Sequence, residues 1–196
     1  MKASLMLGVN PNSKREENDF YATDPNAIFK AKDFFKEINL SNNIWECACG
    51  TGHLSKALQK LGYNVKSSDV IDRGYGETID FLKYNQNWEG DILTNPPFKL
   101  ASEFIQHSMN ILKDEALAVF FLKVQFLETK KRANLFSNCG LKYVCINSER
   151  VCCAKDGEFD QYFKQDENGV YKGGTQLYCW FVFQKGFSGD AIIKFI

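Results

Sequence analysis

Residues 43–69 read NIWECACGTGHLSKALQKLGYNVKSSD, and this stretch decides the fold. Its first part, 43–48, predicts a short strand, and two glycines follow at Gly50 and Gly52. Apolar residues then recur at helical spacing over 53–61, and Gly62 ends that helix. A second strand is predicted over 64–69. A strand, a glycine turn, a helix and a strand in this order indicate an α/β protein.

The alternation continues outward from this unit. Further helices are predicted over 27–38, 100–112 and 128–136, the first of them introduced by Asp24-Pro25. Further strands are predicted over 91–94, 116–122, 142–146 and 176–184, and 191–196 is either an edge strand or a docked tail. We expect a mainly parallel sheet with helices on both faces, in which 176–184 can run antiparallel because it follows an irregular stretch.

Length and composition indicate one domain. The chain has 196 residues, of which 44% are hydrophobic, and a chain of this size buries about 70% of its unfolded surface. We expect a flexible arm over 1–18 and a single domain over 19–196, with a loop at 154–174 that could take part in target recognition. Lys and Arg together number 24, as do Asp and Glu, so no overall basic field attracts a polyanion.

The seven cysteines do not suggest a disulfide framework or a metal site. Cys47/Cys49 and Cys152/Cys153 are too close in sequence for the former, and with two histidines they lack zinc-ligand spacing. No stretch of 18 apolar residues could span a membrane. We expect reduced thiols and a cytoplasmic location, in a bacterium or a phage-infected host cell.

Two acidic residues, taken with the glycine turn, indicate a nucleoside site. Asp69 ends the second strand about twenty residues after the turn, where a carboxylate can accept hydrogen bonds from both ribose hydroxyls. Asp80 and Phe81 could contact an adenine amine and ring. Taken singly, a glycine turn and an aspartate at a strand end are both common without any ligand. Together they favour a nucleoside, although the full GxGxxG pattern and the Walker lysine are absent.

The segment DILTNPPF, residues 91–98, is more specific. Two consecutive prolines cannot continue the hydrogen bonds of a strand, so they fix a rigid turn directly after it. Asn95 offers an amide oxygen there, Pro96 a carbonyl and Phe98 an apolar ring. This arrangement is a receptor for a planar group that carries an NH2.

These segments together resemble a known family. DFYATDP (19–25), WECACGTGHLSKAL (45–58), SSD (67–69), DFL (80–82) and DILTNPPF (91–98) are similar to the motifs of class I S-adenosylmethionine-dependent methyltransferases. Within that group the chain resembles compact phage or prophage DNA N6-adenine methyltransferases with an Asn-Pro-Pro-aromatic motif. The resemblance implies a Rossmann-like, mainly parallel seven-stranded sheet with one antiparallel strand, S-adenosylmethionine as cofactor, and methyl transfer to the N6 amine of a flipped adenine in DNA.

The resemblance also assigns roles. The residues implied to hold the cofactor are Thr23, Glu46, Cys47, Ala48, Gly50, Gly52, Asp69, Val70, Asp80, Phe81 and Asn95. The residues implied to form the catalytic turn are Asn95, Pro96, Pro97 and Phe98. Cys49 and His53 replace the more usual small or apolar residues around the glycine turn. Phosphate contacts are expected from Lys123, Lys130, Lys131, Arg132, Arg150 and Lys155, although 130–132 could equally be a solvated helix face.

Three alternatives stay open. The same turn serves enzymes that methylate amino groups of RNA bases or the side-chain amide of a protein glutamine. The chain could instead be a catalytically silent S-adenosylmethionine-binding subunit. A homodimer or a separate specificity partner is compatible with each of these functions.

Overall fold

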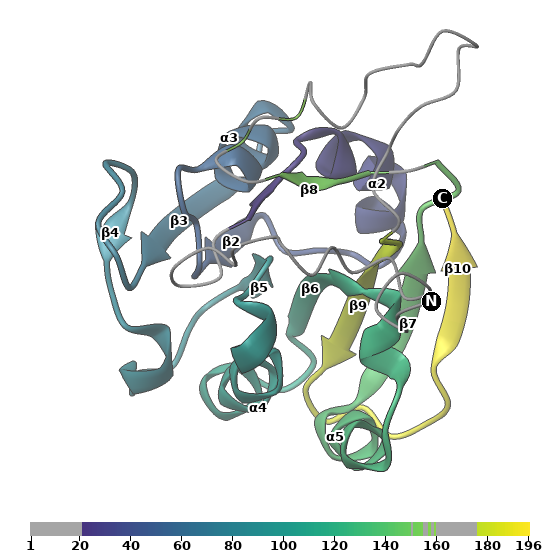
Figure 1. Ribbon diagram of the computed structural model, residues 1–196. Helices are drawn as coiled ribbons and strands as arrows, with labels where there is room; N and C mark the ends of the chain where they lie inside the picture. Colours follow the sequence, from purple (N-terminus) through teal and green to yellow (C-terminus); the bar gives the residue numbers. More distant parts are fainter. Residues whose placement is uncertain (1–20, 150, 155–156, 158, 160–175) are drawn as a thin grey trace, which may run out of the picture.

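In the computed structural model, which describes residues 21–149, 151–154, 157, 159 and 176–196, the described chain is built on one eight-stranded sheet (Figure 1). From one edge to the other the strands are β10 (Ile192–Phe195), β7 (Leu141–Ile146), β9 (Tyr178–Gln184), β6 (Leu117–Lys123), β5 (Asp91–Thr94), β2 (Asn43–Glu46), β3 (Asn64–Asp69) and β4 (Glu77–Thr78). β9 runs antiparallel to both of its neighbours, and the other neighbouring strands are parallel.

The sheet confirms the expected mainly parallel arrangement and the antiparallel strand, but it has eight strands where seven were expected. The end of the chain forms an edge strand, β10, which pairs in parallel with β7. The Ile196 N–H donates to the Ile146 carbonyl just beyond the paired residues. Within this sheet, the strand that the sequence did not indicate is β4, because two exposed residues carry no apolar alternation.

Helices cover both faces of the sheet, as expected (Figure 1). They are α2 (Asn26–Glu37) and α3 (His53–Lys60) on one face, and α4 (Ala101–Ile111) and α5 (Lys130–Cys139) on the other. In the described part, short 3-10 turns follow strands or loops: η2 (Phe81–Lys83), η3 (Phe98–Leu100) and η4 (Val124–Leu127).

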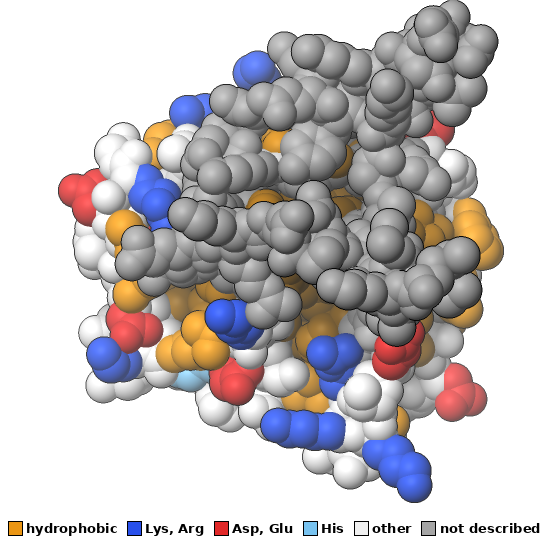
Figure 2. Space-filling model, viewed as in Figure 1, with side chains coloured by type: hydrophobic (Ala, Val, Ile, Leu, Met, Phe, Trp, Pro, Cys, Tyr) orange, Lys and Arg blue, Asp and Glu red, His pale blue; other side chains and the backbone are white. Residues whose placement is uncertain are grey.

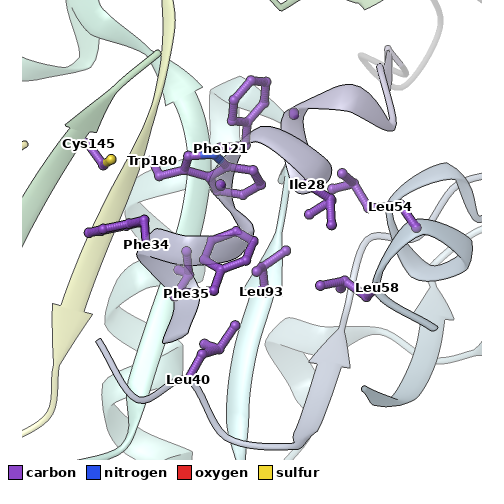
Figure 3. Packing of buried hydrophobic residues seen from close by; sticks show 14 of the residues in the cluster. Ile28, Phe34, Phe35, Leu40, Leu54, Leu58, Leu93, Phe121, Cys145 and Trp180 are labelled. Atoms are coloured by element: carbon purple, nitrogen blue, oxygen red, sulfur yellow. The ribbon is translucent and has the colours of Figure 1, made fainter. Parts of the chain in front are cut away.

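Alternation along the strands supplies both cores, because successive side chains of a strand point to opposite faces. Phe121 joins the cluster under α2 and α3, whereas its neighbour Phe120 joins the cluster under α4 and α5. In the first cluster, Phe35 of α2 packs edge-on against Trp180 of β9, with ring centroids 5.3 Å apart (Figure 3). Because β3, β2, β5 and β6 run in the same direction, their carboxyl ends meet at one edge of the sheet.

A second, two-stranded sheet lies apart from the main one. β1 (Ala22–Thr23) pairs antiparallel with β8 (Cys153–Ala154), so that Thr23 faces Cys153 and Ala22 faces Ala154. In Figure 1, β8 crosses above the main sheet beside α2 and α3. The Asp24 N–H also donates to the Cys152 carbonyl, and the Asp24 carboxylate accepts from the Asn26 N–H at the start of α2. This small sheet ties the segment before the first helix to the segment after β7.

Two expectations fall outside the described residues: the arm at 1–18 and most of the loop at 154–174. All seven cysteines lie in the described part; each is buried and forms no disulfide. Within that part, no helix combines the length and the apolar character needed to cross a bilayer.

Candidate active site

A cavity of about 400 Å³ opens where β2, β3 and β5 end. This volume lies within the usual range for small-molecule sites, about 300 to 1,000 Å³. The expected site residues that line it are Thr23, Glu46, Cys47, Ala48, Asp69, Val70, Asp80, Phe81, Asn95, Pro96, Pro97 and Phe98. The fold thus brings together five segments that are dispersed over 76 positions of sequence, from Thr23 to Phe98.

Gly50 and Gly52 do not line the cavity; they shape the turn behind it. The Gly50 N–H donates to Asp69 Oδ2 at 2.9 Å. Gly52 has a φ of 84°, and a Cβ there would lie 2.4 Å from the ring of Tyr75. Gly52 is therefore required here because the Tyr75 ring occupies the space that a Cβ would need.

The Asp69 carboxylate is held rigidly at the cavity wall. Its Oδ2 accepts from Gly50, and its Oδ1 accepts from the Ile71 N–H at 3.0 Å. Each carboxylate oxygen has a second lone pair, so both can still accept a hydroxyl proton. Val70, beside it, lines the cavity and is 59% exposed. This geometry suits a sugar with two neighbouring hydroxyls.

Glu46 places a buried carboxyl at the same wall, with only 1% of the residue exposed. Ser55 donates to Oε2 at 3.1 Å and Thr94 donates to Oε1 at 2.8 Å. Burial raises the pKa of Glu46 to about 8, and the negative charge of Asp69 adds to this effect. A cation that enters the cavity beside Glu46 would lower that pKa and would gain a carboxylate partner.

Asp80 and Phe81 also line the cavity. Asp80 caps η2 by accepting from the Leu82 N–H at 3.2 Å, and its other oxygen lies 2.9 Å from Lys83 Nζ. Phe81 packs between Trp45 and Phe104, with ring centroids 5.3 and 4.9 Å away. The apolar ring is well placed to flank a flat group, whereas the Asp80 carboxylate already has two partners.

The turn at 95–98 brings an unusual acceptor to the cavity. Asn95 Nδ2 donates to Thr23 Oγ1 at 2.8 Å and to the Tyr21 carbonyl at 3.3 Å. Asn95 Oδ1 is buried and has no hydrogen-bond partner among the described residues. An unpaired buried acceptor is costly, and Asn95 lines the cavity, so its oxygen is a candidate partner for a donor of a ligand.

The structure adds cavity residues that the motifs did not assign. They are Tyr21, Ala22, Cys49, His53, Leu54, Ile71, Arg73, Leu82, Lys83, Leu100 and Phe104. Six of them lie inside the quoted motifs without an assigned role, and the other five follow a motif by one to six positions, so proximity in sequence was the available signal. His53 lies 3.0 Å from Thr51 Oγ1 through Nδ1 and packs edge-on against Phe159. Burial lowers the pKa of His53.

The cations expected to contact phosphate are dispersed. Lys123 ends β6, and its ammonium lies 4.9 Å from the centre of the Phe98 ring, in the turn at 95–98. Lys130 and Lys131 are exposed at the start of α5. Arg132 instead donates to the Gln125 carbonyl at 3.0 Å and covers the Phe126 ring, so it ties α5 to η4.

Among the described residues, the cations at these positions do not form one continuous basic surface. Figure 2 shows Lys and Arg interspersed with Asp and Glu over α4 and α5. Arg150 and Lys155 lie outside the described residues. Of the residues expected to contact phosphate, the structure brings Lys123 to the Asn-Pro-Pro-Phe turn.

Comparison with solved structures identifies the fold. A putative class I S-adenosylmethionine-dependent methyltransferase from Listeria monocytogenes matches with a TM-score of 0.58 at 15% identity, over 92% of this chain and 67% of that chain. The fold is that of the class I methyltransferases. A putative RNA methyltransferase from Pyrococcus horikoshii matches with a TM-score of 0.56 at 14% identity, over 93% of this chain and 95% of that chain.

A third structural neighbour contains the cofactor. It is the magnesium protoporphyrin IX methyltransferase of Synechocystis with bound S-adenosylmethionine, with a TM-score of 0.51 at 12% identity, over 83% of this chain and 79% of that chain. By sequence, no protein-family profile and no curated protein matches the chain. At these identities the methyltransferase likeness is one of fold.

Proposed function

We propose that this protein transfers a methyl group from S-adenosylmethionine to the N6 amine of adenine in DNA. The observation that carries the proposal is the unpaired, buried Asn95 Oδ1, which shares one cavity with the Glu46 and Asp69 carboxyls. An acceptor for an amine thus lies beside acceptors for a nucleoside with a cationic tail. The class I methyltransferase fold and the Asn-Pro-Pro-Phe turn support the same reading.

The residues that line the cavity fit the cofactor in chemistry, and the cavity fits it in size. Glu46 would meet the methionine ammonium, Asp69 the two ribose hydroxyls, and Val70 and Phe81 the two faces of the adenine. Cys47 and Ala48 would line the methionine end. S-adenosylmethionine, when bound, supplies a methyl group on a positively charged sulfur, which keeps the electron pair of the broken C–S bond.

The residues of the turn would prepare the accepting amine. Asn95 Oδ1 and the Pro96 carbonyl would accept its two N–H bonds, which directs the nitrogen lone pair toward the methyl group. The positive charge that develops on nitrogen is stabilised by these two oxygens before one proton leaves to water. Alignment therefore supplies the chemistry, and a strong general base is not needed.

The base must leave the duplex to reach this turn. The N6 amine of a paired adenine lies inside the helix, so the enzyme acts on a flipped or single-stranded base. Phe98 would replace the lost stacking, and Lys123, Lys130 and Lys131 would contact the flanking phosphates. Seven free, buried thiols agree with an enzyme that works in the cytoplasm.

The acceptor class separates this proposal from its nearest alternatives. The neutral net charge leaves room for an RNA base amine or a protein glutamine at the same turn. The Asn95 acceptor disfavours a catalytically silent cofactor-binding subunit, because such a protein has no use for an unpaired oxygen at that place.

One experiment distinguishes these functions. The purified protein is incubated with methyl-labelled S-adenosylmethionine and, separately, with unmethylated duplex DNA, single-stranded DNA, RNA and a glutamine-containing peptide. Digestion of the nucleic acids to nucleosides then identifies the product. Labelled N6-methyldeoxyadenosine supports the proposal. Label in RNA or peptide alone, or cofactor binding without transfer to any acceptor, rejects it.

A further inference from the structure

The side-chain amide of Asn95 is held from one side by the small β1–β8 sheet. Its Nδ2 lies 2.8 Å from Thr23 Oγ1, 3.3 Å from the Tyr21 carbonyl and 3.5 Å from Cys153 Sγ. Thr23 and Cys153 are themselves paired across the two strands, with Oγ1 and Sγ 3.7 Å apart. All of these contacts are made by residues more than 50 positions from Asn95 in the sequence.

The partners decide which end of the amide faces the cavity. A backbone carbonyl can only accept, so Tyr21 requires a donor beside it. If the amide were turned over, Oδ1 would face that carbonyl oxygen at about the same 3.3 Å, and two acceptors would repel each other. The cavity would then meet an NH2 group, which cannot accept an N–H bond of a substrate.

We propose that Thr23 is a positioning residue for Asn95: its hydroxyl and the Tyr21 carbonyl fix the amide so that Oδ1 is presented to the accepting amine. Its catalytic consequence rests on the proposed methyl transfer, and it gives Thr23 a task beyond any contact with the cofactor. The acceptor half of the site is then built from three segments, which are 21–23, 95–98 and 151–154.

Three variants test this role in turnover. Thr23→Val keeps the shape and removes the acceptor oxygen, so we expect kcat at saturating cofactor to fall roughly tenfold or more, because a buried N–H loses its partner. The dissociation constant of the cofactor should change by less than about threefold, as expected if Thr23 makes at most a weak contact with the cofactor. Thr23→Ser keeps an oxygen and should recover most of kcat. Thr78→Val, the same change on exposed β4, should behave as wild type.

Other results would overturn the proposal. If Thr23→Val weakens cofactor binding and leaves kcat unchanged, Thr23 acts at the cofactor end alone. If Thr23→Ser loses as much activity as Thr23→Val, the hydroxyl oxygen is not what matters. Where Thr23→Val melts below the assay temperature, Thr23→Ala takes its place in the same comparison.

A second measurement does not depend on activity. In protein labelled with 15N-asparagine, the side-chain NH2 signal of Asn95 is assigned by its loss in Asn95→Ala. Its hydrogen exchange should be slow in wild type and in Thr23→Ser, and roughly tenfold faster in Thr23→Val, because a lost hydrogen bond lowers protection. Equal exchange in all three rejects the positioning contact. A wild type that methylates no acceptor but shows this pattern rejects the proposed function and keeps the contact.

Discussion

At the scale of single residues, two side chains divide the work of the cavity. Asn95 has an unpaired, buried oxygen, and Glu46, which accepts a hydrogen bond from the neighbouring Thr94, has a buried carboxyl. We expect the rate of methyl transfer to depend on the Asn95 oxygen and the affinity for the cofactor to depend on the proton of Glu46.

Removal of the Asn95 amide should separate transfer from cofactor binding. In Asn95→Ala we expect methyl transfer to fall by on the order of a hundredfold, as when a group that stabilises developing charge is removed. Cofactor binding, measured by calorimetry, should stay within about threefold of wild type. The exposed Asn87→Ala is the matched control. An equal loss of binding and transfer would contradict the role assigned to Asn95.

The raised pKa of Glu46 should make cofactor affinity depend on pH. Below about 8 the free protein carries a protonated Glu46, which must lose its proton to pair with a cation. The affinity should therefore rise by up to about tenfold per pH unit from pH 6 toward 8 and then level off. Glu46→Gln should bind weakly at every pH and remove this part of the slope. The difference between the two titration curves isolates Glu46 from the amine of the ligand, and parallel curves would show that Glu46 does not titrate on binding.

At the scale of elements, the turn between β2 and α3 depends on a contact with Tyr75. Gly52 combines a φ of 84° with a Cβ position 2.4 Å from that ring, whereas Gly62 has a φ of 93° and open space around it. Both are glycines with a left-handed backbone, but one of them alone faces a steric contact.

This difference predicts unequal costs of alanine. Gly62→Ala should lower the free energy of unfolding by about 1 to 2 kcal/mol, the cost of a left-handed backbone. Gly52→Ala should cost more, by roughly 1 to 3 kcal/mol of overpacking. Denaturant unfolding of both variants measures the difference. In the double variant Gly52→Ala/Tyr75→Ala, the extra loss of unfolding free energy caused by Gly52→Ala should disappear. If it persists, the strain lies in the backbone alone.

At the scale of the whole molecule, the binding of a polyanion must come from local cations, since the net charge is zero. If Lys130 and Lys131 contact phosphates, Lys130→Ala/Lys131→Ala should lower DNA affinity and reduce the slope of log K against log salt by about 1 to 2. Lys32→Ala/Lys60→Ala, exposed on α2 and α3, is the matched control. Fluorescence anisotropy between 50 and 200 mM salt, the range over which such contacts respond strongly, measures both. An unchanged slope would assign Lys130 and Lys131 to a solvated helix face.

The sequence could predict the features that repeat along the chain. Periodicity identified the helices and the long strands, and an irregular connection marked 176–184 as the strand that could reverse. It could not predict β4, β1 or β8, because strands of two residues have no period. The sequence assigned Thr23 a role only through a motif. Its contact with Asn95 could not be predicted, because it spans 72 positions and depends on a strand pairing that no local pattern indicates.

The pairing of β1 with β8 has a consequence for the order in which the molecule assembles. Thr23 and Cys153 are 130 positions apart, and the cost in chain entropy of joining two points grows with the length of chain between them. Two residues per strand return little for that cost, so the pairing becomes favourable only on a sheet that has already folded. We therefore expect nascent molecules to complete the wall formed by Glu46 and Asp69 first and to gain the contacts that orient Asn95 last, and we expect partial unfolding to remove these parts in the reverse order.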